Sequence, residues 1–184
     1  EHTGLPIPRF VHILNHDRVR TFLRDVPPPW MFKPRGEASS HGITKCVHPD
    51  EVWKRIEELG DRQSNYLLEQ MITGDVHHVD SIVFDREVVF AIASKYSVPP
   101  LEVSQKGRVF ATRTLPRGSF EDESLRDLNR RVLQGMGLKN GVSHTEFLCQ
   151  TGTGKFHFIE TSARVGGAHI VELVEAATGL NLWA

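Results

Sequence analysis

The feature that most constrains this chain is a predicted β-hairpin over residues 144–164, HTEFLCQTGTGKFHFIETSAR. Apolar and polar residues alternate on both sides of a Gly-rich turn, which is the pattern of two paired strands. If Thr151 pairs with Lys155 across Gly152-Thr153-Gly154, Glu146 lies directly opposite Glu160. Like charges in such positions destabilise a strand pair by roughly 0.2–1 kcal/mol. The hairpin therefore raises the question of what offsets the repulsion.

A bound divalent cation would offset it, because hard oxygen ligands on adjacent strands suit Mg²⁺. Side chains on alternate strand positions share a face. The faces of the two glutamates would accordingly also hold His144, Leu148, Phe156, Phe158 and Ser162. Alternatively, a hairpin slipped by one residue or turned to solvent would leave both glutamates as surface charges. The H-x-E of a zinc deaminase is excluded, because its P-C-x-x-C partner is absent from the sequence.

The segment after Glu160 has the composition of an anion receptor. Arg164, the pair Gly166-Gly167 and the start of a predicted helix follow in close order. A guanidinium beside free backbone N–H groups at a helix start would bind a phosphate or a carboxylate. In the alternative reading, the two glycines only serve a tight turn.

Lys33 is a second candidate for phosphate binding. It ends the apolar stretch WMFK and precedes a loop of small residues between Gly36 and Gly42. Such a loop can lie close to phosphates, with the lysine as a point charge on them. Neither G-x-x-x-x-G-K-[ST] nor G-x-G-x-x-G occurs, so the chain has no P-loop or Rossmann motif. Taken alone, Lys33 also fits an ordinary surface lysine.

The composition excludes some classes of partner. Twenty-two basic against 23 acidic side chains leave no excess for binding nucleic acid or an anionic membrane surface. Cys46 and Cys149 lack metal-type spacing and favour the cytoplasm, and we expect no membrane span and no signal peptide. Neither end of the sequence reads as a natural terminus, so we expect a piece of a longer chain.

The periodicity predicts an α+β fold with mostly antiparallel strands flanked by helices. Two lobes are expected, over residues 1–72 and 73–184. Helices are expected over residues 15–25, 48–60, 122–137 and 169–179, and strands over 30–33, 65–72, 77–96 with a turn at Asp85-Arg86, 108–116 and in the hairpin.

Together, these elements resemble the ATP-grasp family. The resemblance lies in Lys33 before its small-residue loop, the strand end Glu69-Gln70-Met71-Ile72, Glu146, and the I-E-x-x-x-R of Glu160 and Arg164. The segment over residues 141–182 is especially similar to carboxylate-amine ligases and biotin carboxylases. The family's N-terminal Rossmann-like domain has no counterpart in this sequence.

The resemblance implies a set of site residues for Mg-ATP held between two lobes. Lys33 would contact the phosphates, the segment Glu69, Gln70, Met71 and Ile72 would hold adenine, and His77 would contact ribose. Glu146 and Glu160 would ligate Mg²⁺, or Mn²⁺ in its place. Ser162 stands where the family has Asn and would bind the metal through water, and Arg164 would stabilise the transferring phosphoryl group.

The resemblance also implies a reaction, in which ATP activates a small carboxylate as an acyl phosphate for attack by an amine. A homodimer is compatible with it. Three alternatives stay open at this point: a nucleotide-binding module without chemistry, a kinase-type relative that phosphorylates a hydroxyl, and a plain metal-binding β domain.

Overall fold

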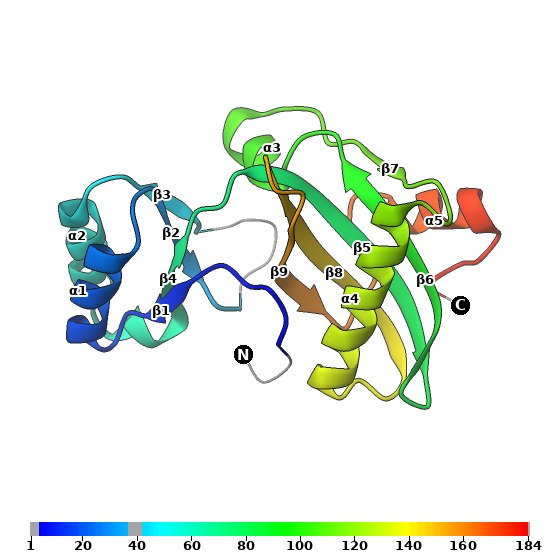
Figure 1. Cartoon of the computed structure of the whole chain (residues 1–184), viewed down its shortest axis with the longest axis horizontal. Helices are drawn as coiled ribbons and strands as arrows, with labels where there is room; N and C mark the ends of the chain where they lie inside the picture. The colour runs from blue at the N-terminus through cyan, green and yellow to red at the C-terminus, as the bar shows by residue number, and fades with distance from the viewer. Residues whose placement is uncertain (1–3, 37–41, 184) are drawn as a thin grey trace. The chain divides into compact units, whose positions relative to one another are not determined.

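The computed structural model describes residues 4–36 and 42–183, apart from the side chain of Gln105, and forms two compact units (Figure 1). The smaller unit is residues 8–72, and the larger unit is residues 73–183 together with residues 4–7. The predicted smaller lobe began at residue 1, which differs from this division. Residues 4–7 group with the larger unit because the Phe158 N–H donates to the Pro6 carbonyl at 2.8 Å and Leu5 packs into that unit's core.

The smaller unit is a four-stranded antiparallel sheet with strand order β1-β4-β2-β3. Its elements are β1 (Phe10–His12), α1 (His16–Asp25), β2 (Trp30–Pro34), β3 (Thr44–Cys46), α2 (Pro49–Leu59), a 3-10 helix η1 (Gly60–Asn65) and β4 (Tyr66–Gln70). Both helices and the two central strands were predicted from the sequence. Strands β1 and β3 were not predicted, because three residues are too few to show a period of two.

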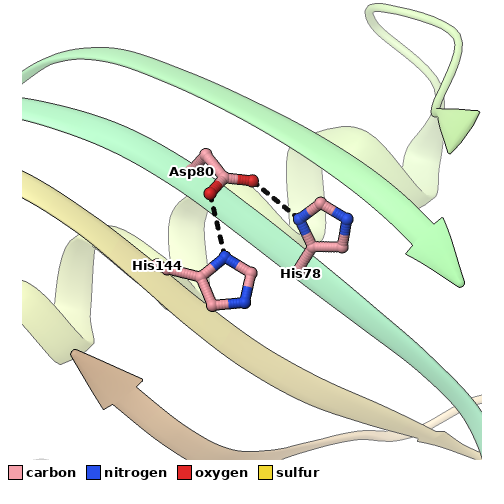
Figure 2. A group of neighbouring side chains, drawn as sticks. All are labelled: His78, Asp80 and His144. Atoms are coloured by element: carbon pink, nitrogen blue, oxygen red, sulfur yellow. Dashed lines mark hydrogen bonds and ion pairs between the residues drawn. The ribbon is translucent and has the colours of Figure 1, made fainter. Parts of the chain in front are cut away.

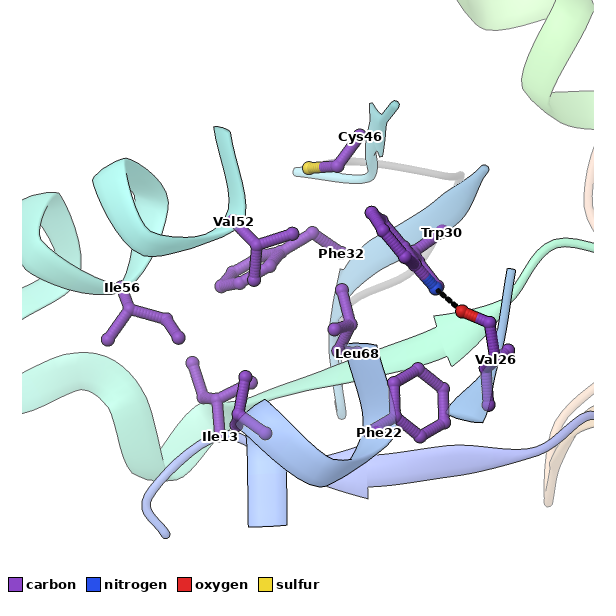
Figure 3. Packing of buried hydrophobic residues seen from close by; sticks show 10 residues of the cluster. Ile13, Phe22, Val26, Trp30, Phe32, Cys46, Val52, Ile56 and Leu68 are labelled. Carbon is purple, nitrogen blue, oxygen red and sulfur yellow. Dashed lines mark hydrogen bonds between the residues drawn. The ribbon is translucent and has the colours of Figure 1, made fainter. Parts of the chain in front are cut away.

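The two helices pack on one face of this sheet. Asn15 caps α1 by accepting the Arg18 N–H at 3.0 Å, and Pro49 occupies the first turn of α2. The core between helices and sheet is shown in Figure 3; it includes Val19, Phe22, Trp30, Phe32, Val52, Ile56 and Leu68. Strand alternation therefore turns Lys33 of β2 and Glu69 of β4 to the opposite face.

The larger unit is a five-stranded antiparallel sheet with strand order β7-β6-β5-β8-β9. Its elements are β5 (Gly74–Phe84), β6 (Glu87–Tyr96), α3 (Pro100–Lys106), β7 (Thr112–Thr114), α4 (Phe120–Met136), β8 (Gly141–Gln150), β9 (Phe156–Ser162) and α5 (Ile170–Thr178). Helix α4 packs on the face that carries Val79 and Phe147, and α5 packs on the face that carries Val76 and Tyr96. Helix α3 was not predicted.

The hairpin β8–β9 pairs differently from the prediction at its turn. Gln150, not Thr151, lies opposite Lys155, since the Gln150 N–H donates to the Lys155 carbonyl at 2.8 Å. This pairing continues to Phe147, which lies opposite Phe158. Continued without interruption, it would turn Glu146 and Glu160 to opposite faces.

A β-bulge restores the predicted glutamate pair. The register shifts between Glu146 and Phe147, so that Ile159 is the extra residue and Glu160 lies opposite Glu146. The surroundings of the glutamates also differ from the prediction. Phe156 and Phe158 lie between the turn and the bulge, and they pack in the core under α4 instead of on the glutamate face. The expected pair is thus confirmed, although the turn and the neighbouring face were wrong.

These two antiparallel sheets with their helices confirm the predicted α+β class. Within residues 4–36 and 42–183, no helix combines the length and the apolar character that crossing a membrane requires.

Candidate active site

Glu146 and Glu160 lie side by side on the face of the larger sheet that is opposite α4. The Glu146 side chain is 15% exposed, and Glu160 is exposed. Ser162 follows on the same face, opposite His144. Three oxygen-bearing side chains thus line one short stretch of the hairpin, and oxygen donors of this kind suit Mg²⁺.

Oε1 of Glu146 accepts a hydrogen bond from the Tyr96 hydroxyl at 2.9 Å. The same oxygen lies 3.6 Å from Nε2 of His144. Burial and the neighbouring Glu146 carboxylate both raise the pKa of Tyr96, so its hydroxyl keeps the proton that it donates. Tyr96 comes from β6, two strands away from β8, and sequence analysis did not find it.

A buried carboxylate, Asp80, supports this arrangement from β5 (Figure 2). Its Oδ2 lies 2.7 Å from Nδ1 of His78, and its Oδ1 lies 2.9 Å from Nδ1 of His144. Burial by itself would raise the pKa of Asp80, but the hydrogen bonds from the two histidines outweigh burial and lower it to about 2. Asp80 is therefore ionised and can only accept, so each Nδ1 donates.

His144 is the cation nearest to Glu146 in this network. Burial would lower the pKa of His144, but its contacts with Asp80 and Glu146 outweigh burial and raise that pKa to about 9. The imidazolium is therefore charged at neutral pH. His144 therefore supplies part of the positive charge that the facing glutamates require. From the sequence, His144 was predicted only to lie on the glutamate face.

His78, Asp80 and His144 also form a group that could hold a metal ion. In the structure, each Asp80 oxygen already serves one imidazole, and the main chain at Gly166 packs directly on the group. A Cβ at Gly166 would lie 3.0 Å from both Asp80 Oδ1 and His144 Nδ1. We therefore interpret this cluster as a closed hydrogen-bonded support. A His-x-Asp alternation within an apolar strand was the sequence signal that could have revealed it.

The predicted anion receptor lies after β9. Arg164 is exposed, and its Nη1 donates to the Val165 carbonyl at 2.8 Å. Helix α5 begins at Ile170, three residues after Gly167. A pocket of about 460 Å³ in the larger unit is lined by Val142, Arg164, Val165, Gly166, Gly167, Leu182 and Trp183. A guanidinium and two glycines beside apolar walls suit an anionic group that carries an apolar part.

In the smaller unit, the structure brings Lys33 and Glu69 together. Lys33 Nζ lies 2.9 Å from Glu69 Oε2, and both side chains are 16% exposed. Burial raises the pKa of Glu69, and the neighbouring ammonium opposes this only in part. An ammonium has three N–H donors, so one such bond leaves donors for a second anion.

The other predicted nucleotide contacts are placed as follows. Gln70, Met71 and Ile72 are half-buried at the end of β4, where the Met71 N–H donates to the Pro29 carbonyl at 3.2 Å. Residues 37–41 of the predicted phosphate loop lie outside the described residues. His77 is not brought to the glutamates: it is buried on the α4 face, and its ring contacts Phe156 at 5.5 Å between centroids.

Comparison with known proteins agrees with this fold. Residues 26–172 match the family of the ATP-grasp domain, and the chain belongs to this family. It is 24% identical over 186 residues to the L-arginine-specific L-amino acid ligase of Bacillus subtilis, covering 98% of this chain and 44% of the relative.

Solved structures with the same fold include an L-amino acid ligase from Bacillus licheniformis, at a TM-score of 0.71 and 19% identity, with 98% of this chain and 42% of that chain covered. They also include the biotin carboxylase domain of Hydrogenobacter thermophilus 2-oxoglutarate carboxylase with MgADP and bicarbonate. Its TM-score is 0.74 at 17% identity, with 98% and 41% covered. The chain spans less than half the length of these relatives.

We predict that Asp80→Asn destabilises the protein in a pH-dependent manner. The folded pKa of Asp80, about 2, lies below the value near 4 of an unfolded Asp, so its contribution is present above pH 4 and is lost as the pH falls towards 2. At pH 7, the free energy of unfolding should be roughly 2–3 kcal/mol higher for the wild type than for the variant. Urea titrations at pH 7, 4, 3 and 2 test this.

The matched control is Asp17→Asn, since Asp17 is 91% exposed in a surface ion pair with Arg20. That variant should stay within about 0.5 kcal/mol of wild type, as surface substitutions usually do. A wild-type advantage over Asp80→Asn that is constant from pH 7 to pH 2 would contradict the assignment of a buried, ionised Asp80.

We predict that Gly166→Ala and Gly167→Ala have different effects on stability. The added methyl at Gly166 would meet Ile170 Cγ2 at 2.8 Å and the Asp80–His144 pair at 3.0 Å, whereas at Gly167 nothing lies within 4 Å. Overpacking of this kind costs about 1–3 kcal/mol. Thermal melts of the two variants should show a lower midpoint for Gly166→Ala only; equal midpoints would refute the close packing.

Proposed function

We propose that the protein containing this chain is an ATP-dependent ligase that activates a carboxylate as an acyl phosphate for attack by an amine. The observation that carries the proposal is the pair Glu146 and Glu160 on one sheet face, with Ser162 beside them, in a chain of the ATP-grasp family. This oxygen donor set fits Mg²⁺, and Mn²⁺ would fit as well.

The similarity to two L-amino acid ligases favours amino acids as the small-molecule substrates. An amino acid offers both groups that the reaction needs, a carboxylate and an amine. The proposal does not involve nucleic acid or a membrane. Free Cys46 and Cys149 are in keeping with the cytoplasm as the location, and a homodimer is compatible with the family.

Each unit supplies part of the proposed machinery. In the smaller unit, Lys33 would contact phosphate oxygens, and Glu69, Gln70, Met71 and Ile72 would hold the adenine. In the larger unit, Glu146, Glu160 and Ser162 would hold the metal, and Arg164 would neutralise the transferring phosphoryl group or the acyl phosphate. His77 is proposed for the ribose, which its ring could contact only after leaving its buried position on the α4 face.

The proposed reaction has two steps. An oxygen of the substrate carboxylate attacks the γ-phosphorus of ATP, and ADP leaves with the electrons of the broken P–O bond. The amine nitrogen then attacks the acyl carbon, phosphate leaves, and the nitrogen releases a proton to water. The protein positions the reactants and neutralises charge, while Mg²⁺, when bound, offsets the charge of the phosphates.

One departure favours a second candidate, a nucleotide-binding module without chemistry. Ser162 stands where the family has Asn, and a hydroxyl reaches less far towards a metal than a carboxamide does. A kinase-type relative differs in its product, which would be a phosphorylated hydroxyl instead of an amide. Product analysis separates these candidates.

We predict that Glu160→Gln abolishes Mg²⁺-dependent ADP release by the intact protein incubated with ATP and pairs of L-amino acids. The change keeps the shape of the side chain and removes the charge that the cation requires. The rate of ADP release should fall by more than the roughly 10–100-fold that is typical when a residue that only supports a metal ligand is replaced. ADP release and amide formation are measured together.

Glu87→Gln is the control, because Glu87 is an exposed glutamate at the other end of the sheet, where β6 begins. It should release ADP at the wild-type rate. Undiminished turnover by Glu160→Gln would count against the proposal, and wild-type protein that binds ATP but releases no ADP with any amino acid pair would favour the binding module.

A further inference from the structure

The two oxygens of Glu146 have different surroundings. Among the described residues, both side-chain contacts of Glu146 use Oε1, which lies 2.9 Å from the Tyr96 hydroxyl and 3.6 Å from His144 Nε2. Oε2 takes part in neither contact. The carboxylate is thus fixed through one oxygen, while the other is the one that a cation beside Glu160 could use.

The Tyr96 hydroxyl is itself held in place. The side chain is 4% exposed, and its ring packs against Phe110 at 5.5 Å and against the His78 ring at 4.7 Å between centroids. His144 Nε2 lies 3.3 Å from the hydroxyl. These contacts hold the phenol ring on both sides, and its O–H donates to Glu146 Oε1.

The residues that contact Tyr96 are themselves held by hydrogen bonds. His78 and His144 both donate to Asp80, and Nε2 of His78 lies 2.8 Å from the Thr112 hydroxyl of β7. A continuous set of contacts, buried in the middle and partly buried at both ends, therefore runs from the edge strand β7 across the sheet to Glu146. Side chains locked in this way limit how far Glu146 can move.

We propose that Tyr96 is a positioning residue for the metal site, whose hydroxyl holds Oε1 of Glu146 and reserves Oε2 for the cation. The inference rests on the proposed function, because only a bound cation gives this orientation a use. Partners of this kind, which orient a ligand without touching the metal, typically change metal affinity 10–100-fold when they are removed.

Tyr96→Phe tests the proposal, since it removes one oxygen atom and keeps the ring in its packing site. The probe is Mn²⁺ added to the intact protein with a non-hydrolysable ATP analogue, and free Mn²⁺ is followed by electron paramagnetic resonance. The affinity for Mn²⁺ should fall about 10–100-fold. The affinity for the analogue without metal should be unchanged, because Tyr96 does not contact nucleotide in the proposed assignment.

Ser81→Ala is the matched control for loss of a buried hydrogen bond in the same sheet. Ser81 lies on β5 and accepts from Asn129 Nδ2 at 2.7 Å, on the α4 face. This variant should have a lower melting temperature and wild-type Mn²⁺ affinity. A loss of Mn²⁺ affinity in Ser81→Ala as large as that in Tyr96→Phe would overturn the positioning role, because any destabilising change would then suffice.

Including Glu160→Gln in the same titration separates the two proposals. If Glu160→Gln loses Mn²⁺ and Tyr96→Phe binds it as tightly as wild type, the role of Tyr96 is refuted and the ligase proposal stands. If wild-type protein and Glu160→Gln bind Mn²⁺ equally, the metal site itself is refuted, and with it the role of Tyr96. Selective loss in Glu160→Gln and Tyr96→Phe supports both.

Discussion

The arrangement of the candidate site depends on one buried carboxylate. Asp80 is fully buried and stays ionised because two imidazoles donate to its two oxygens. A buried charge without partners would cost several kcal/mol, and removal of a partner from such a pair is strongly destabilising. The three side chains therefore hold one another in a single geometry. That geometry places a charged His144 beside Glu146 and supports the main chain at Gly166, close to Arg164.

The β-bulge at Ile159 is the second constraint, and it acts on the backbone. The pairing set by the turn would separate Glu146 and Glu160, and the extra residue brings them back to one face. Bulges often re-aim side chains next to functional sites. Here the bulge divides β9 into two parts, one that fills the core under α4 and one that carries polar side chains on the other face. One strand thus serves both packing and chemistry.

Sequence reasoning succeeded where the signal is local. The periodicity of α1, α2, α4 and α5 and the alternation of the hairpin strands are properties of single segments, and they led to the α+β class. The order of Lys33, Glu69, Glu146, Glu160 and Arg164 led to the family. The reasoning failed where partners are distant in the chain: Tyr96 reaches Glu146 across 50 positions, and His144 reaches Asp80 across 64. It also missed β1 and β3, whose three residues carry no period.

The sequence by itself therefore determined the longer helices and strands, the fold class and the types of side chain available for binding a nucleotide and a metal, because these follow from short-range patterns and residue chemistry. Only the tertiary structure decided which side chains meet. Strand order places β5 between β6 and β8, so that Tyr96, His78 and Asp80 converge on His144 and Glu146. Burial then sets their charges, since desolvation and hydrogen bonding depend on neighbours that the linear order does not reveal.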